Sequence, residues 1–397
     1  MSTVDQILSN LPITKPAFDE GEEQLLIETL RSGWVVQGPR VAEFERMVAE
    51  HANAAHAIAT TSCTTALHLS LIAAGIEPGD EVIVPAFTWI ATANVVEYVG
   101  ATPVFCDIDP RTFNIDVDQA ETLITPKTRA ILPVHLFGLC ADMVRLEATA
   151  KTHGLSIIED AACALDAWQD GRHAGTFGDS GCFSFHPRKV ITTGEGGMVL
   201  TNDDEVAAKC KILRDHGAAA SDLVRHQSKT GYLLTAFEQL GFNYRLTDLQ
   251  GALGVCQMQK LNCIQSSRRS LAARYDEALS SIDWLETPLV PEGYTHGYQA
   301  YVCQMSGLDA DSGNLDELHE KRNRIMQTLQ EQGISTRQGT HAVHNLGLYR
   351  RKYDLESGDF PASHAADKLT LAIPLYSEMT TSDQDRVIES LLTVENH

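Results

Sequence analysis

The chain has 397 residues, more than a single hydrophobic core usually organises, so its length predicts two domains. Its 53 acidic and 31 basic residues give a formal net charge of -22, which argues against general binding to nucleic acid or to an anionic membrane surface. Hydrophobic residues make up 43% of the chain, an ordinary globular value, and no stretch approaches the ~20 apolar residues of a membrane span.

Helical and strand-like patterns alternate along the first two thirds of the chain. Predicted helices cover residues 20–31, 41–51, 65–74, 90–99, 117–123, 143–153, 203–213 and 247–261. Predicted strands cover residues 57–59, 82–84, 102–105, 130–134, 156–158, 181–185 and 197–200. Strands that alternate with helices of about this length predict an α/β fold with a mainly parallel, doubly wound sheet.

The last third of the chain predicts a smaller α/β unit. A helix at residues 267–279 leads into it, and a strand at 301–305 and a helix at 316–332 follow. We therefore expect a large domain at residues 1–265 and a small C-terminal domain at residues 266–397. The most loop-like stretches are 218–234 and 346–360; for 218–234, a mobile flap over the active site and a solvated connector both stay open.

The first segment with recognisable chemistry begins a helix. Residues 60–65 read Thr-Thr-Ser-Cys-Thr-Thr and follow a predicted strand. Hydroxyl side chains and free N–H groups at a helix N-terminus form an anion site that suits a phosphate. From this stretch alone, ordinary N-capping by Ser62 or Thr64 is the simpler interpretation.

Two further candidates, Trp89 and Asp160, lie at the ends of predicted strands. The flat ring of Trp89 is able to stack on a flat cofactor, although core packing is the commoner fate of a lone tryptophan. Asp160 is at the carboxyl end of a buried apolar run, where open α/β sheets bind ligands. A carboxylate there can pair with a protonated pyridine nitrogen, as pyridoxal phosphate (PLP) requires; alone, Asp160 reads as a helix N-cap.

Lys189 lies in an apolar segment that is followed by Gly194, Gly196 and Gly197. Loss of hydration should lower the pKa of the lysine toward the neutral amine, which is the form that a Schiff base with an aldehyde cofactor requires. The glycines allow the backbone to approach a ligand closely. A lone lysine is usually a surface residue, and only its combination with Asp160 indicates a cofactor site.

Together these segments resemble the DegT/StrS family of PLP-dependent sugar aminotransferases, which have the aspartate-aminotransferase-like fold of type I. The resemblance covers nearly the whole chain, and the order and spacing of its short motifs make it specific. The motifs are Ser-Gly-Trp-Val-Val-Gln-Gly-Pro at 32–39, Pro-Val-His-Leu-Phe-Gly at 133–138, Glu-Asp-Ala-Ala at 159–162, the Lys189 segment, Asn-Tyr-Arg at 243–245 and Ile-Pro-Leu-Tyr at 373–376.

The resemblance implies a role for each residue of the cofactor site. Lys189 is expected to bind PLP covalently and to move the proton, Asp160 to pair with the pyridine nitrogen, and Trp89 to stack on the ring. The phosphate contacts are expected from Cys63, Thr64 and Ser184, with Asn243 reaching across the interface of a homodimer whose active sites are shared.

Three positions are less well defined by the resemblance. The family often has Gln or His where this chain has Cys163, a weak hydrogen-bonding group, so its contact with the cofactor is an open expectation. Arg337 and His344 lie in the stretch where family members contact the sugar, and a solvated loop is an equal alternative. Arg245, Arg337, His341 and His344 are candidates for local positive charge.

The implied reaction moves an amino group from an amino acid, expected to be L-glutamate, to a C4 or C3 keto group of a nucleotide-linked sugar, in amino-sugar biosynthesis for surface polysaccharide or natural products. Two alternatives stay open. A sugar dehydratase of the same family would carry His in place of Lys189, and a catalytically silent regulatory homologue should have lost Lys189 or Asp160.

The remaining features predict a cytoplasmic protein without a metal. The nine cysteines show no paired framework and no Cys-x-x-Cys spacing, which is typical of reduced thiols. No signal peptide is apparent near the start of the sequence. His341 and His344 have no obvious third partner for a metal ion.

Overall fold

The computed structural model describes residues 10–219, 235–237, 239–308 and 313–394. Its largest element is a seven-stranded sheet in the order β1-β10-β9-β6-β5-β2-β4. The strands are β1 (His56–Thr60), β2 (Glu81–Pro85), β4 (Thr102–Cys106), β5 (Thr128–Ile131), β6 (Ser156–Asp160), β9 (Ser180–Ser184) and β10 (Gly197–Thr201). Only β10 runs against its neighbours β1 and β9, so the prediction of a mainly parallel sheet is confirmed.

Both faces of this sheet are covered, as the apolar strands require. Ile58 and Val199 point into a core with the helices α4 (Cys63–Ala73), α5 (Ala91–Tyr98) and α8 (Asp204–Leu213). Their neighbours Ala59, Met198 and Leu200 point into the opposite core, which includes α3 (Pro39–Ala52). Side chains of a strand alternate between faces, so these short strands serve two cores at once. The other helices of this part are α2 (Glu20–Ser32), α6 (Val117–Thr122) and α7 (Met143–His153).

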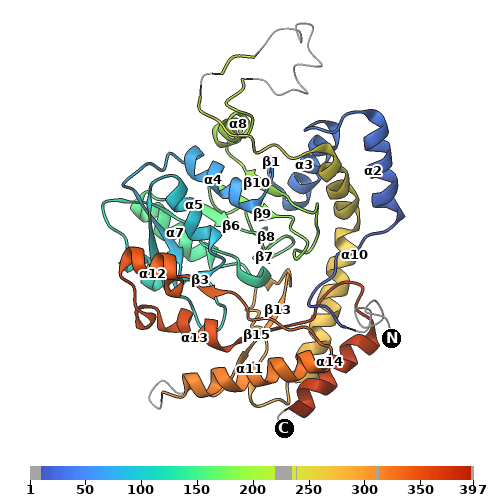
Figure 1. Ribbon diagram of the computed structural model, residues 1–397. Helices are drawn as coiled ribbons and strands as arrows, with labels where there is room; N and C mark the ends of the chain where they lie inside the picture. The colour runs from blue at the N-terminus through green and yellow to red at the C-terminus, as the bar shows by residue number, and fades with distance from the viewer. Residues whose placement is uncertain (1–9, 220–234, 238, 309–312, 395–397) are drawn as a thin grey trace.

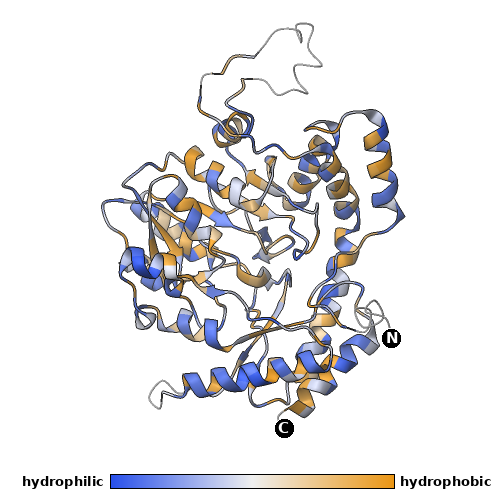
Figure 2. Ribbon diagram, viewed as in Figure 1, coloured by the Kyte–Doolittle hydropathy of each residue, from blue (hydrophilic) through white to orange (hydrophobic). Residues whose placement is uncertain are grey.

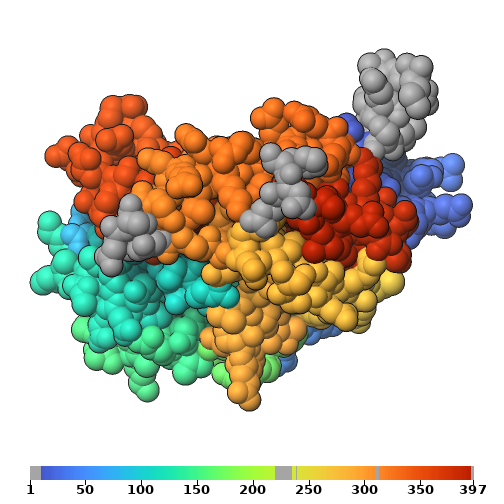
Figure 3. Space-filling model, turned by 90° about the horizontal axis from the view of Figure 1, so that it is seen from below, coloured from blue at the N-terminus to red at the C-terminus, as the bar shows by residue number. Residues whose placement is uncertain are grey.

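A second, three-stranded antiparallel sheet lies in the C-terminal part of the chain. It consists of β11 (Leu285–Glu286), β13 (Tyr301–Met305) and β15 (Thr370–Ile373). Its core includes residues of α11 (Leu315–Glu331), α13 (Pro361–Leu369) and α14 (Thr381–Thr393). Figure 2 shows hydrophilic and hydrophobic bands alternating along α11, and in Figure 3 the orange C-terminal segments lie beside the cyan ones while the red segment lies beside the yellow one.

One helix, α10 (Asp248–Leu279), belongs to both cores. Val255 and Leu261 pack in the core under the large sheet, whereas Tyr275 and Leu279 pack in the core of the small sheet. Figure 1 shows α10 running from the region of α3 toward α14. The prediction of two helices, at 247–261 and 267–279, was therefore wrong. The division into domains at residues 265 and 266 stays a prediction, and its boundary would fall inside α10.

The loop predicted at residues 346–360 was also wrong, because it contains the helix α12 (Gly347–Tyr353). Tyr349 is fully buried, with its ring centroid 5.4 Å from that of Phe105, and its hydroxyl donates to Asn94 at 2.8 Å. These tertiary contacts stabilise a turn of helix that is too short to be stable alone. The stretch predicted as a flap or connector, 218–234, lies almost entirely outside the described residues.

Short strand pairs connect the two parts of the chain. β3 (Phe87–Thr88) pairs with β14 (His341–Ala342), which places His341 opposite Thr88. The strands β7 (Trp168–Gln169), β8 (Arg172–His173) and β12 (Tyr294–Thr295) form a three-stranded sheet. The remaining short elements are the 3-10 turns η1 (Leu136–Gly138), η2 (Val343–Asn345) and η3 (Ser357–Asp359). Among the helices of the described residues, none has both the length and the apolar character needed to cross a membrane.

Candidate active site at the edge of the large sheet

Asp160 is the last residue of β6, and its backbone forms hydrogen bonds with residues 133 and 135, which follow the neighbouring strand β5. Its N–H donates to the carbonyl of Pro133 at 2.8 Å, and its carbonyl accepts from the N–H of His135 at 3.0 Å. The carboxylate is buried, with 5% of the residue exposed. Oδ2 accepts a hydrogen bond from Thr92 Oγ1 at 2.8 Å, and Oδ1 accepts from the N–H of Ala162 at 3.2 Å. The carboxylate therefore has a fixed orientation.

Burial raises the pKa of the Asp160 carboxyl group. Desolvation raises the pKa of its carboxyl above the ordinary value, while the hydrogen bonds from Thr92 and Ala162 and the charge of Lys189 act in the opposite direction. A buried carboxylate of this kind is most stable as a partner of a cation. The site therefore suits a protonated ring nitrogen.

Lys189 follows β9 and reaches the same edge of the sheet. Its Nζ is 3.2 Å from the Sγ of Cys163. Desolvation acts to lower the pKa of Lys189, but Cys163, Cys63 and Asp160 raise it by more, and the net pKa lies above its ordinary value. The expectation of a lowered pKa was therefore wrong, because it considered burial alone and not the acidic groups that the fold places around the amine.

Cys63 and Thr64 are the first residues of α4, which begins two residues before the predicted helix start at residue 65. Ser62 is the N-cap, and its hydroxyl accepts from the N–H of Thr65 at 3.2 Å. N-capping and anion binding are compatible here, because the N–H groups of the first helical turn, those of Cys63 and Thr64, have no partner within a helix. The Cys63 side chain points toward β9 and β6: its thiol donates to the carbonyl of Cys182 at 3.3 Å and lies 3.9 Å from Asp160 Oδ1.

Ser184 lies at the same end of the sheet as the N-terminus of α4. It pairs with Gly197, which in turn pairs with Thr60, two residues before the N-cap. A Cβ atom on Gly197 would lie 2.2 Å from the backbone carbon of Ser62, so only glycine allows β10 to approach the start of α4 this closely. The half-buried Ser184 hydroxyl accepts from the N–H of His186 at 3.4 Å.

Trp89 follows β3 directly and is not a core residue, since 59% of it is exposed. Its ring centroid is 5.8 Å from that of His341, with an interplanar angle of 40°. The exposed position leaves a face of the indole free for a flat ligand. His341, which the sequence indicated as a possible local charge, is brought beside Trp89 by the pairing of β3 with β14.

The two predicted substrate contacts, Arg337 and His344, differ in their exposure to solvent. Arg337 is exposed, and its backbone pairs with Ala372. Desolvation and the nearby charge of Arg337 lower the pKa of Arg188, which directly precedes Lys189 in the chain. His344 is fully buried, with its ring centroid 4.8 Å from that of Phe360. Its position does not support a contact with substrate.

Asn243, the residue predicted to cross a dimer interface, is exposed and forms a backbone bridge with Asp215. Its neighbour Arg245 makes an ion pair with Asp215, at 2.6 Å between Nη1 and Oδ1. The charge of Arg245 is therefore compensated within the chain. The exposed amide of Asn243 is available to a partner.

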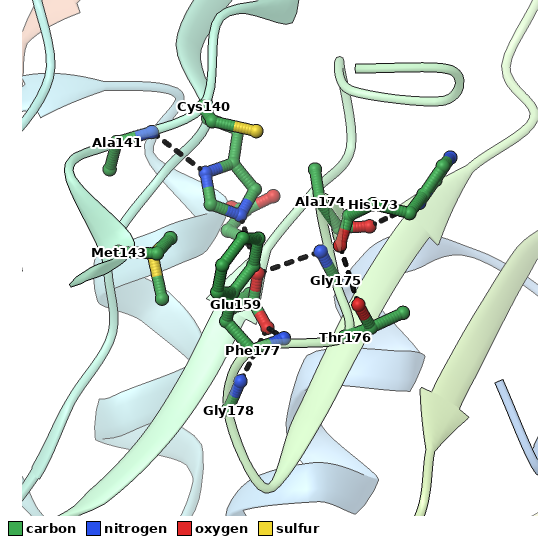
Figure 4. A network of polar contacts seen from close by, with 12 residues as sticks. Cys140, Ala141, Met143, Glu159, His173, Ala174, Gly175, Thr176, Phe177 and Gly178 are labelled. Carbon is green, nitrogen blue, oxygen red and sulfur yellow. Dashed lines mark hydrogen bonds and ion pairs between the residues drawn. The ribbon is translucent and has the colours of Figure 1, made fainter. Parts of the chain in front are cut away.

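Glu159 is a residue that the sequence interpretation passed over. It is fully buried beside Asp160, and its Oε2 is 2.8 Å from Nε2 of the fully buried His135. Because His135 Nδ1 accepts from the N–H of Ala141 at 3.0 Å, the ring proton is on Nε2 and the histidine donates to Glu159. Figure 4 shows this network.

The same carboxylate holds the loop after β8. Its Oε2 accepts from the N–H of Gly175 at 2.7 Å, and its Oε1 accepts from those of Phe177 at 2.7 Å and Gly178 at 2.6 Å. Glu159 therefore ties this loop and the His135 segment to the strand that carries Asp160 (Figure 4). The sequence signal was an acid at the end of an apolar run that predicts a buried strand, because acidic side chains are almost never fully buried unless they are paired.

The residues at this edge match the chemical demands of PLP. A buried carboxylate suits the pyridine nitrogen, an amine suits the aldehyde, a helix N-terminus suits the phosphate and an exposed indole suits the ring face. Across the described ranges, no group of three or more His, Cys, Asp or Glu residues is placed to hold a metal ion.

Comparison with known proteins gives a consistent result. The DegT/DnrJ/EryC1/StrS aminotransferase family matches residues 16–392. The spore coat polysaccharide biosynthesis protein SpsC of Bacillus subtilis is 38% identical over 382 residues, 96% of each chain. GDP-perosamine synthase of Caulobacter vibrioides is 38% identical over 389 residues, which cover 97% of this chain and 99% of that one.

Two solved structures share the fold over nearly their full length. Helicobacter pylori PseC, an aminotransferase involved in the biosynthesis of pseudoaminic acid, superposes with a TM-score of 0.88 at 26% identity, covering 98% of this chain and 100% of that one. The PLP form of Spr1654 from Streptococcus pneumoniae has a TM-score of 0.88 at 28% identity and covers 98% and 99%.

Proposed function

The chain belongs to the DegT/DnrJ/EryC1/StrS aminotransferase family, and from this premise we propose that it transfers the amino group of L-glutamate to the C4 or C3 keto group of a nucleotide-linked sugar. The family and the structural neighbours show a PLP-dependent sugar aminotransferase. The observation that carries the proposal is the meeting of Lys189, Asp160 and the N-terminus of α4 at one edge of the sheet.

Each of these groups has a separate task in the proposed reaction. PLP, when bound, supplies an electron sink for the charge that develops at the α-carbon of the amino donor. Asp160 would hold the proton on the pyridine nitrogen, and Trp89 would cover the ring. Lys189 Nζ would take the proton from the α-carbon, and its tether keeps it within reach for both half-reactions.

The remaining proposed contacts concern binding. The N–H groups of Cys63 and Thr64, with the hydroxyls of Thr64 and Ser184, would hold the phosphate of PLP. The thiol of Cys163, 3.2 Å from Lys189 Nζ, would lie beside the reacting centre. Arg337 would add local positive charge for the phosphates of a nucleotide sugar, which a chain of net charge -22 otherwise repels.

The proposed role also includes a pathway, amino-sugar biosynthesis, and a compartment, the cytoplasm. The names of SpsC and GDP-perosamine synthase point to spore coat polysaccharide and to a GDP-linked sugar, respectively, and support a role in amino-sugar biosynthesis. All nine cysteines are free, which supports a reducing, cytoplasmic compartment.

The visible absorption of the purified protein tests the donor and the acceptor together. We expect an absorption band of bound PLP that L-glutamate bleaches and that one keto nucleotide sugar of a panel restores. Restoration by that sugar would also identify the substrate. A band that another amino acid bleaches while L-glutamate does not would refute the proposed donor, and a bleached band that no keto nucleotide sugar restores would refute the proposed acceptor.

The shared active site of a homodimer makes a second prediction. We expect a dimer in analytical ultracentrifugation, and we expect Asn243→Ala to weaken PLP binding about tenfold while the dimer persists, because one hydrogen bond to the phosphate is lost. Asn323→Ala is the matched control, since Asn323 is an exposed residue of α11. A fully active monomer would contradict the role of Asn243.

A further inference from the structure

Three oxygen atoms form a buried chain that ends on Asp160. Thr88 Oγ1 is 2.9 Å from Thr92 Oγ1, and Thr92 Oγ1 is 2.8 Å from Asp160 Oδ2. Thr88 is 1% exposed, Thr92 0% and Asp160 5%, so water does not compete for these contacts. The two threonines lie on β3 and in the first turn of α5.

The chain of hydroxyls has a fixed direction when Asp160 is ionised. A carboxylate can only accept, so the hydroxyl proton of Thr92 must point to Oδ2. The oxygen of Thr92 then accepts from the hydroxyl of Thr88 at 2.9 Å. A protonated Asp160 would be able to donate to Thr92 instead, which would reverse the chain. The hydrogen bond from Thr92 lowers the pKa of Asp160 and so favours the ionised form.

The Thr92 hydroxyl is committed to this contact instead of to its own helix. Threonine in a helix commonly bonds back to a carbonyl one turn earlier. Here the hydroxyl leaves the helix and reaches Oδ2, while Oδ1 accepts from the N–H of Ala162. Each oxygen of the buried carboxylate thus has a donor of its own. Loss of one donor would leave a buried charged oxygen unpaired, which is the costly case.

The two hydroxyl groups also connect Asp160 with β3, which Trp89 directly follows. Thr88 lies opposite His341 in the β3–β14 pair, and the next residue is Trp89. The segment that carries the exposed indole is therefore joined to the buried carboxylate through two hydroxyls.

We propose that Thr92 is a positioning residue of the reaction, which keeps Asp160 ionised and oriented toward the cofactor nitrogen, and that Thr88 fixes the direction of the Thr92 hydroxyl. The inference rests on the proposed function only in giving Asp160 the pyridine nitrogen as its partner. It concerns how Thr88 and Thr92 keep that carboxylate ionised and oriented.

The test compares Thr92→Val, which removes the donor at nearly constant volume, with Thr92→Ser, which retains it. We expect Thr92→Val to raise the Kd for PLP about tenfold, measured by titrating PLP into the protein after removal of the cofactor and following tryptophan fluorescence. We expect Thr92→Ser to stay within about twofold. Thr328→Val is the matched control, because the Thr328 hydroxyl donates to the carbonyl of Arg324 within its own helix, α11.

The pH profile gives a readout that a purely structural role would not move. Loss of the Thr92 donor raises the pKa of Asp160 further, and the ionised form is lost as the pH falls through that pKa. The acidic limb of the pH profile of kcat should therefore move to higher pH in Thr92→Val, by about one unit for a tenfold effect, and return in Thr92→Ser.

The outcomes separate this inference from the proposed reaction. PLP titration needs neither L-glutamate nor a sugar, so a failure of those substrates leaves it intact. Unchanged PLP affinity and an unchanged acidic limb in Thr92→Val would overturn the inference. If Thr92→Val does not fold, Thr92→Ser and Thr88→Val decide: we expect parental PLP affinity for the first and a Kd raised about threefold for the second, and the reverse order would overturn the inference.

Discussion

Replacement of Lys189 by alanine is expected to lower kcat by about 10⁴-fold or more, the range seen when a residue that performs the chemistry is removed. The Nζ atom is the amine at this edge of the sheet that lies within hydrogen-bonding distance of Cys163, close to the buried Asp160. Without it, no tethered base remains to move the proton from the α-carbon. The measurement is steady-state transamination together with the visible spectrum.

Two controls make the result specific. Lys127→Ala removes an exposed lysine and should leave kcat unchanged. A small primary amine added to Lys189→Ala should restore part of the activity, because it replaces the missing base without repairing any structural defect. Full activity of Lys189→Ala with an amino donor would refute the proposed reaction.

Replacement of Glu159 by alanine is expected to cause the largest loss of stability, about 4 kcal/mol. The change leaves four donors without their acceptor in a fully buried place: three backbone N–H groups and His135 Nε2. Each unpaired buried donor costs roughly 1–3 kcal/mol, and partial relaxation keeps the total below their sum. The midpoint of thermal unfolding should fall by about 5 °C, because the unfolding entropy grows with the length of the chain.

Glu159→Gln and Glu389→Ala complete this experiment. Glutamine retains one acceptor oxygen and should lose about half as much as alanine, whereas Glu389 is exposed on α14 and its replacement should change the melting midpoint by less than about 1 °C. Equal melting midpoints for Glu159→Ala and the parent protein would show that the network does not stabilise the fold.

The mainly parallel sheet could be predicted from the sequence because its strands are short apolar runs, most of which alternate with helices. The strand ending at Asp160 and the helix beginning at Cys63 are examples, since hydrophobic period and capping residues are local signals. Lys189, Asp160, Trp89 and the start of α4 were predicted as a site from motifs in a fixed order, and the structure brings them to one edge of the sheet.

What could not be predicted depends on contacts between distant segments. The sequence predicted two helices where the structure has the single helix α10, within which Gln265 Nε2 donates to the carbonyl of Leu165 at 2.9 Å. The fully buried Arg268 donates to the carbonyls of Tyr298 at 2.8 Å and Gln299 at 2.7 Å. These carbonyls lie far along the chain and accept hydrogen bonds from side chains that look solvent-exposed in the sequence.

The same holds for the chemistry of the site. The pKa of Lys189 depends on Cys63, Cys163 and Asp160, which no local pattern places near the amine. Thr92 looks like an ordinary helix residue until its hydroxyl is seen 2.8 Å from Asp160 Oδ2. Motifs identify the residues that react, whereas the residues that prepare them are defined by the fold.

The continuous helix α10 has a consequence for how proteins of this fold could exchange parts during evolution. Its 32 residues extend about 48 Å and enter both hydrophobic cores. A recombination event in its middle would join half-helices whose apolar faces were selected against different partners. Crossovers that preserve both cores should therefore fall near its ends, so that the C-terminal part of the chain is inherited together with the helix on which it is built.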